Sequence, residues 1–383
     1  MTALVVSVFE PVWISDNFIE SITDDVVSYS HTINSSGGYW SCEVSVGGGR
    51  VKAENWLTRL GYQIKVFNED LQVIWEGFVN EVSISLGGLD LTRGPLMDIG
   101  NRVDVAYQTP SYNFNAGITV GGDESLTALA NDVPSQNLYG IRRKRLSAGT
   151  ASSTEADQIR DTFLEDNKDP PLSQTIGIGG SSGGGISVQV NCLGYAHMLD
   201  YQPSQIAVAG TENLSDKIEE ILGLDPNSLF STDYSGIAEN TTLVAKYYGE
   251  DGQTALDMIK SLVSLGDSSN SRYTWGVYGD RKLAYQAVPA TYEYAFKLSD
   301  KGQRVFRAQG AGTEVKPWDV LPGEYLLVSD ILVGEIVPSS LRTDPRMAFV
   351  ESVTYTAPRA LQIAGGKFSR VDQQLARLGL GAQ

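Results

Sequence analysis

The sequence contains few of the residues that most enzymes and metal sites depend on. Its 383 residues include only two cysteines, Cys42 and Cys192, and two histidines, His31 and His197. The cysteines are too few for a disulfide framework and lack the spacing of a zinc site, so neither an oxidising compartment nor a structural metal is indicated. Both lie in alternating runs, and we expect them to be small core residues. Neither histidine lies in an H-x-x-x-H or H-E-x-x-H pattern, so we expect core or surface positions.

Long apolar runs are also missing. No stretch approaches the ~20 apolar residues that a membrane-spanning helix needs. The first segment, MTALVVSVFEPVWISDN, has no basic region and contains Glu10 and Pro11, which is unlike a signal peptide. We therefore expect synthesis in the cytoplasm without membrane insertion.

Positive charge is scarce. The 29 Lys and Arg residues are outnumbered by 46 Asp and Glu residues, which gives a formal net charge of −17. Affinity for phosphate depends on cations that replace condensed counterions, so the surface as a whole does not bind nucleic acid. Solubility is the simplest explanation of the charge. A wall past which DNA slides without sticking is a second one, because like charges repel.

Strand patterns dominate what is present. The composition, 42% hydrophobic and 20% charged, is that of a globular protein with room for two or three domains. Tyr62 to Ser85 predicts a three-stranded meander, with a turn at Asn68-Glu69-Asp70 and a third strand after Gly77. Alternation places every second side chain on one face of each strand: Tyr62, Ile64 and Val66 in the first, then Leu71, Val73 and Trp75 in the second.

The first half of the chain reads as a β module with an insertion. Residues 1–110 are almost wholly strand and turn, with a tight hairpin at Gly87-Gly88. Residues 111–185 are rich in Asn, Ser, Gly and Pro, with one helix whose Ser152 and Glu155 have capping-box spacing and whose apolar stripe packs on a neighbour. A flexible Gly/Ser tract follows, and residues 186–205 return to strand and close the first module.

The second half reads as a small α+β domain and a further β module. In residues 206–291, one helix begins with Ser215 as N-cap and stops at Gly223, and another ends at Gly266 after a buried face. A hairpin that turns at Gly279-Asp280 follows. Residues 292–383 return to strands and end in a short helix. The buried face predicted for the second helix is Leu256, Ile259, Leu262 and Val263.

Six pieces of the chain resemble the baseplate or tail-tip hub proteins of tailed bacteriophages, in particular those of long-tailed siphophages. Each piece is a strand, helix or hairpin of common residues, and the resemblance lies in their order and spacing. They are QVIWEGFVNEVSIS at 72–85, VQVNCLGYAHML at 188–199, TALDMIKSLVSLGD at 254–267, TWGVYGDRKLAYQAVP at 274–289, VKPWDVLPGEYLLVSD at 315–330 and LRTDPRMAFVESVTYTAP at 341–358.

The resemblance implies a mainly β (α+β) fold in which two tail-tube-like β-barrel or sandwich domains are joined by smaller α+β domains. It implies a structural virion protein without enzymatic activity or cofactor, made in the host cytoplasm. Three copies would form a ring at the tip of the tail tube and adapt the hexameric tube to a trimeric spike or fibre. The implied partners are the tube or distal tail protein, the spike or fibre, and the tape-measure protein, and DNA would pass through the lumen. No repeat links the two predicted barrels in this sequence.

One basic cluster stands out against the acidic background. Arg142, Arg143, Lys144 and Arg145 are four adjacent cations without interleaved aromatic residues. In an oligomeric acidic protein they suit ion pairs with a neighbouring subunit or the tube better than a phosphate. Trp318 is a further interface candidate. A sugar-binding platform is an alternative for the strand tryptophans, although large aromatic residues at strand positions are more often core. The strand tryptophans in question are Trp40, Trp75, Trp275 and Trp318.

Two other functions stay open as alternatives. The first is a carbohydrate- or receptor-binding tail-tip protein, which needs an exposed aromatic cluster. The second is a cell-wall hydrolase. GGSSG at 179–183 fits the pattern G-x-S-x-G but lacks the strand and helix that hold such a nucleophile. A carboxylate pair such as Glu250 with Asp257 would suit a glycosidase, but nothing singles the pair out. The acidic loops lack the twelve-residue calcium pattern.

Overall fold

The computed structural model describes most of the chain. The described residues are 4–113, 118–176, 186–202, 210–245, 253–269, 271–289, 291–299, 302–307, 315–329, 347–357 and 360–366. The fold is mainly β, as the strand patterns predicted, with helices confined to short segments around the sheets. The Gly/Ser tract at 177–185 and the expected C-terminal helix lie outside the described residues.

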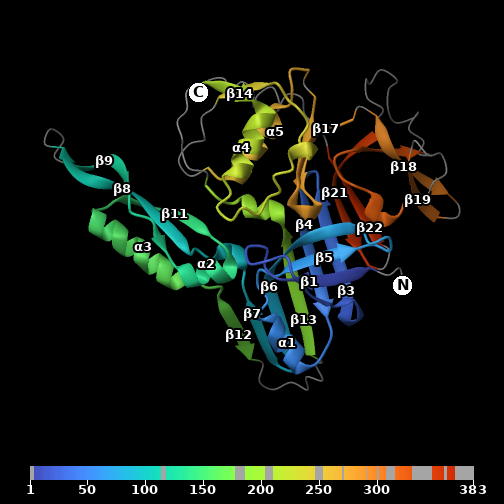
Figure 1. Cartoon of the computed structure of the whole chain (residues 1–383), viewed down its shortest axis with the longest axis horizontal. Coiled ribbons are helices and arrows are strands. Elements are labelled where there is room, and N and C mark those ends of the chain that lie inside the picture. The colour runs from blue at the N-terminus through green and yellow to red at the C-terminus, as the bar shows by residue number, and fades with distance from the viewer. Residues whose placement is uncertain are drawn as a thin grey trace.

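One large mixed sheet forms the body of the molecule (Figure 1). Within the described residues it contains sixteen strands. The strands from the first half of the chain are β1 (Val5–Phe9), β2 (Phe18–Ser21), β3 (Val26–Asn34), β4 (Ser36–Val46), β5 (Gln63–Phe67), β6 (Val73–Leu86), β7 (Leu89–Arg93), β12 (Leu172–Ile176) and β13 (Ile186–Gly194). The strands from the second half are β16 (Tyr273–Val277), β17 (Leu283–Ala287), β18 (Tyr292–Ser299), β19 (Gly302–Arg307), β20 (Tyr325–Ser329), β21 (Met347–Thr356) and β22 (Ala360–Gly366).

The order of strands joins the two ends of the chain. The main path runs β19-β18-β20-β21-β3-β4-β13-β6-β5-β1-β2. The C-terminal strands enter it where β21 pairs antiparallel with β3, for example Val353 opposite Ile33. β13 lies between β4 and β6 and pairs antiparallel with both. The first strands therefore obtain their central partner only after the chain has passed through the whole insertion.

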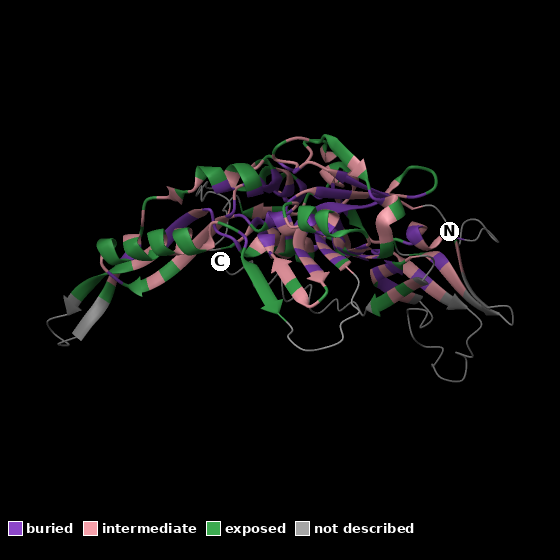
Figure 2. Cartoon of the chain, turned by 90° about the horizontal axis from the view of Figure 1, so that it is seen from below, coloured by how far each residue is buried: buried purple, intermediate pink, exposed green. Residues whose placement is uncertain are grey.

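The segment between β7 and β12 forms an arm that projects from the body (Figure 1). We use the term arm for residues 101–170. Its sheet has the order β10-β8-β11, and β9 pairs with β8. In Figure 2 the arm extends sideways and consists mostly of exposed and intermediate positions, while buried positions gather in the body. The arm contains β8 (Arg102–Asn113), β9 (Ile118–Leu126), β10 (Ala130–Asn131), β11 (Arg143–Thr150), α2 (Val133–Tyr139) and α3 (Ser153–Asn167).

The capping box predicted for the arm helix is present. The Ser152 side chain accepts a hydrogen bond from the Glu155 backbone N–H, and the Glu155 carboxylate accepts one from the Ser152 N–H at 2.8 Å. Of the predicted stripe, Ala156 is fully buried, whereas Ile159 is 41% exposed. The helix therefore covers its sheet only in part.

The α+β unit packs on one side of the body. α5 ends before Gly266, whose φ of 61° suits a residue without a side chain. The predicted hairpin turns at Gly279-Asp280, and its first strand, β16, joins the large sheet by pairing with β4. The remaining elements are α1 (Arg50–Trp56) in the body, and α4 (Leu214–Gly223), α5 (Ala255–Leu265), β14 (Thr211–Asn213) and β15 (Leu243–Ala245) in this unit.

Two local predictions were wrong. Gly77 does not begin a third strand, because β6 continues through it and pairs Gly77 with Gly194 of β13. A Cβ at Gly77 would collide with the Leu193 carbonyl, so the glycine marks a close approach of strands. Leu71 lies in the turn with φ of 58° and is exposed instead of sharing a strand face.

The N-cap of α4 also differs from the prediction. The helix begins at Leu214, and Asn213 occupies the N-cap position. Ser215 lies inside the helix, where its hydroxyl accepts a hydrogen bond from the Asn240 N–H at 3.3 Å. Ser215 therefore does not cap its own helix. It binds the backbone of a residue 25 positions further along the chain.

The core of the body is one large cluster, and the C-terminal strands add a small one. The large cluster joins the N-terminal strands to the α+β unit and reaches Trp318 and Tyr355. The buried members of the small cluster are Tyr294, Val315, Val320, Leu326, Val350 and Val353. None of the described helices is long and apolar enough to cross a membrane.

Candidate functional site

The basic segment predicted as an interface lies at the base of the arm. Arg143 and Arg145 both bind Asp104 of the neighbouring strand β8, at 2.7 and 2.9 Å. The Asp104 side chain is only 5% exposed. Burial acts to raise the pKa of Asp104, but the two guanidinium groups outweigh it and hold the pKa below its usual value. This carboxylate neutralises half of the positive charge of the pair within the chain.

Arg142 turns into the protein. Its backbone N–H donates to Asn101 Oδ1 at 2.7 Å, and its guanidinium lies 5.4 Å from the Trp13 ring and 5.8 Å from the Phe78 ring. Burial lowers its pKa to about 10, and the charges of Asp225 and Asp200 act against that change. Arg142 is therefore still charged at neutral pH, and it holds the arm against the body.

Lys144 is the most exposed of the four cations. Its ammonium group lies 3.4 Å from Asp200, and its side chain is 30% exposed. This pair is the weakest in the segment, because an ion pair at a solvated position contributes little to stability. Lys144 is the member of the cluster whose charge a neighbouring molecule could reach most easily.

Trp318 lies in the core and is 7% exposed. Its ring meets Tyr355 edge-to-face at 5.9 Å between centroids. The preceding Lys316 pairs with Glu69 and, at 3.5 Å, with Asp70 in the turn before β6. Trp318 thus belongs to the large core cluster and links the C-terminal strand β21 to the turn before β6. All five interface candidates make contacts within the chain, and their role between subunits stays a prediction.

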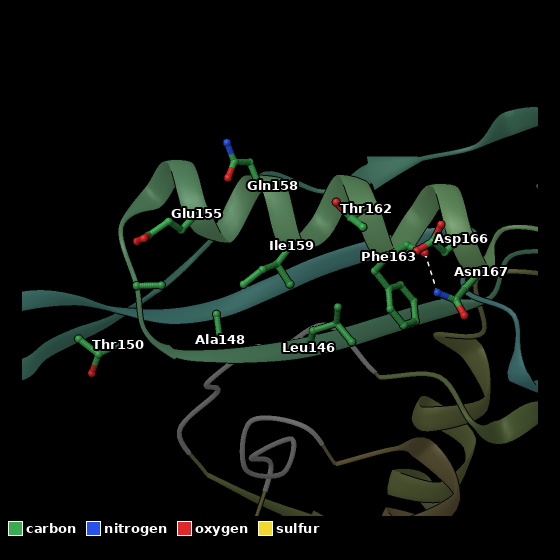
Figure 3. A pocket seen from close by; sticks show the side chains of 11 residues that line it. Leu146, Ala148, Thr150, Glu155, Gln158, Ile159, Thr162, Phe163, Asp166 and Asn167 are labelled. Carbon is green, nitrogen blue, oxygen red and sulfur yellow. Dashed lines mark hydrogen bonds between the residues drawn. The ribbon is translucent and has the colours of Figure 1, made fainter.

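The arm carries an open groove that the sequence did not single out (Figure 3). It has a volume of about 700 Å³ and lies between α3 and β11. Figure 3 shows Ile159 and Phe163 of the helix above Leu146 and Ala148 of the strand. The β11 residues that line it, Leu146, Ala148 and Thr150, alternate along the strand and therefore share the face that α3 covers. The apolar stripe of α3 predicted that the helix packs on a neighbour, but it did not predict that the packing leaves a groove.

His31 is buried and His197 is half-buried, and neither lies in an arrangement suited to catalysis. His31 is 2% exposed, and its Nδ1 lies 2.7 Å from the Tyr29 hydroxyl. Burial lowers the pKa of His31 to about 3. The His197 ring lies 4.1 Å from the Trp40 ring between centroids, tilted by 48°, and partial burial lowers the pKa of His197 to about 4. Both are therefore neutral at physiological pH.

Glu76 is a buried carboxylate that sequence reasoning missed. Its side chain is fully buried, 3.9 Å from the Lys65 ammonium, and accepts a hydrogen bond from the Asp280 N–H at 3.1 Å. Burial raises its pKa, while Lys65 acts in the opposite direction. The contact supports a turn in which Asp280 and Arg281 both have positive φ. A lone charge inside the apolar run VIWEGF was the available signal.

The remaining chemical candidates concern a hydrolase, a metal site and a sugar-binding platform. GGSSG at 179–183 and Glu250 lie outside the described residues. Among the described residues, no group of three or more His, Cys, Asp or Glu side chains is placed to hold a metal ion. Trp75, Trp275 and Trp318 are buried, so these three form no exposed platform for a sugar.

Comparison with known proteins gives structural similarity only. No family model matches the sequence, and no curated protein matches it. The tail protein from Neisseria meningitidis MC58 aligns with a TM-score of 0.40 and 9% identity over 97% of this chain and 99% of that chain. The 43 kDa tail protein of prophage MuSo2 from Shewanella oneidensis gives 0.39 and 9% over 97% and 99%.

A third structure, prophage tail protein gp18 from Listeria monocytogenes EGD-e, gives a TM-score of 0.36 and 10% identity over 99% of this chain and 100% of that chain. TM-scores below 0.5 at such identities do not assign the chain to a family or a function.

Proposed function

We propose that the chain is a structural protein of a bacteriophage tail, and specifically a hub at the tip of the tail tube. The observation that carries the proposal is the strand path that joins N-terminal and C-terminal strands into one sheet through β3 and β21. A chain that contributes two β regions to one wall can fill two positions of a ring. Three copies then imitate a sixfold tube on one side and present threefold symmetry on the other.

The order of segments supports the same proposal. The resembling pieces of sequence fall on β6, β13, α5, the β16–β17 hairpin, β20 and β21. The proposed neighbours are the tube or distal tail protein, a trimeric spike or fibre, and the tape-measure protein. The net charge of −17 suits a lumen through which DNA passes without binding. None of the described residues is a largely exposed tryptophan, so nothing in the structure supports the alternative of a sugar-binding protein.

The test is the mass and shape of the purified protein. Light scattering should give about three times the 41.4 kDa chain mass, and electron microscopy should show a threefold ring with a hole wide enough for duplex DNA. A chain that stays monomeric alone and also in the presence of its tube and spike neighbours would overturn the hub proposal.

We propose further that Lys144 contacts the neighbouring subunit. Lys144→Glu should lower the trimeric fraction, because the reversed charge would repel an acidic neighbour. Asp200→Asn is the matched control, since it removes the internal pair of Lys144 and leaves the lysine charge in place. Equal trimer loss in both variants would mean that the internal ion pair, and not a subunit contact, is what matters.

A further inference from the structure

The two cysteines of the chain face each other across neighbouring strands. Cys42 of β4 and Cys192 of β13 are direct partners in the antiparallel register. They are 150 residues apart in the sequence, and no third cysteine exists to compete with either. Their side chains are 1% and 2% exposed. Both are free thiols in this structure.

The pairing also sets how far apart the two cysteines lie, because they are directly opposite each other on neighbouring strands. Directly opposed antiparallel residues have Cα atoms about 4.5 or 5.5 Å apart, depending on the kind of pair. Both values lie within the roughly 4.4–6.8 Å that a disulfide spans. The spacing of directly opposed residues is therefore compatible with a disulfide between β4 and β13.

We propose that Cys42 and Cys192 are a cross-strand disulfide site, which closes when the folded protein meets a two-electron oxidant outside a reducing compartment. Each S–H bond breaks, one S–S bond forms, and the two protons and two electrons pass to the oxidant. With diamide, the N=N bond becomes a hydrazine. The structure supports a disulfide better than a metal site, because the described residues provide no third metal ligand beside the two cysteines.

Burial sets the rate of this reaction. It raises the pKa of the Cys42 thiol, and the neighbouring Cys192 acts in the same direction. The thiolate is the attacking species, so oxidation of the native protein is slow at neutral pH and accelerates about tenfold per pH unit as the thiolate population rises. The bond links β4 covalently to β13, the strand on which the chain returns from the arm.

The experiment uses the full-length native protein treated with diamide. Intact mass should fall by about 2 Da, and peptide mapping without reductant should join the peptides of Cys42 and Cys192. The oxidised protein should melt roughly 5 °C higher, because the bond closes a long loop, and dithiothreitol should reverse the increase. This outcome is independent of the proposed function.

Single Cys42→Ala and Cys192→Ala variants serve as controls and should show neither the mass loss nor the shift in Tm. Two results would overturn the proposal. One is that both thiols stay free in native wild-type protein after prolonged oxidation at pH 9. The other is that oxidation yields cross-linked dimers in place of the internal bond. Both are read on wild-type protein and do not depend on the folding of a variant.

Discussion

His31 and His197 are kept neutral by burial, and this makes stability depend on pH. Their pKa values in the folded chain are about 3 and about 4, against 6.5 when unfolded. Between the folded and unfolded values the unfolded chain binds more protons, so the stability present above pH 6.5 is lost as pH falls. At pH 5 the loss from His31 alone amounts to about 2 kcal/mol.

We therefore expect the free energy of unfolding to drop between pH 7.5 and pH 5. His31→Gln, whose amide can still bond to the Tyr29 hydroxyl, should show a flatter profile. The measurement is urea unfolding of both proteins at the two pH values. A difference between wild type and variant that does not change with pH would show that His31 is protonated normally in the folded chain.

At the scale of elements, the capping box of α3 fixes the start of the arm helix. Ser152→Ala removes the acceptor for the Glu155 N–H and should destabilise the helix by about 1 kcal/mol. Hydrogen exchange of peptides from α3 should accelerate about fivefold, while peptides from the body stay unchanged. Ser153→Ala, one residue along and exposed, is the control and should have little effect. Equal acceleration in both variants would argue against the cap.

The α+β unit joins the body where two glycines on paired strands, one from each, lie in close contact. A Cβ at Gly276 of β16 would lie 2.5 Å from the Cα of Gly38 in β4. Gly276→Ala should therefore destabilise the protein by roughly 1–3 kcal/mol, through overpacking. Gly223→Ala is the control, because an added Cβ there meets nothing within 4 Å. Chemical unfolding measures both, and a neutral Gly276→Ala would mean that the strands can separate at no cost.

Elements set by local chemistry were predictable, and elements set by distant partners were not. The hairpins at Gly87-Gly88 and Gly279-Asp280 and the capping box follow from residues within a few positions of each other. The role of Gly77 depends on Leu193, which lies 116 positions further along the chain. A run of four cations likewise does not reveal that Arg142 turns inward toward Trp13 and Phe78.

At the scale of the whole molecule, the two cores differ greatly in size. The small C-terminal cluster has six buried members, whereas the large cluster spans the body and the α+β unit. Fewer buried apolar contacts mean a lower free energy of local opening. We expect hydrogen exchange to reach β18, β19 and β20 at a denaturant concentration that leaves β4, β6 and β13 protected. Simultaneous loss of protection in both groups would show that the sheet opens as one unit.

The position of β13 has a consequence for synthesis on the ribosome. β4 and β6 cannot be joined until residue 194 has emerged, because β13, which lies between them, is made after both. Until then the nascent chain presents two unpaired strand edges, which are templates for mispairing with other chains. In the sequence the arm comes between β6 and β13. Early folding of the arm therefore shortens the loop that must close before β13 pairs with β4 and β6. Until β13 pairs with both strands, the exposed edges leave the nascent chain open to aggregation.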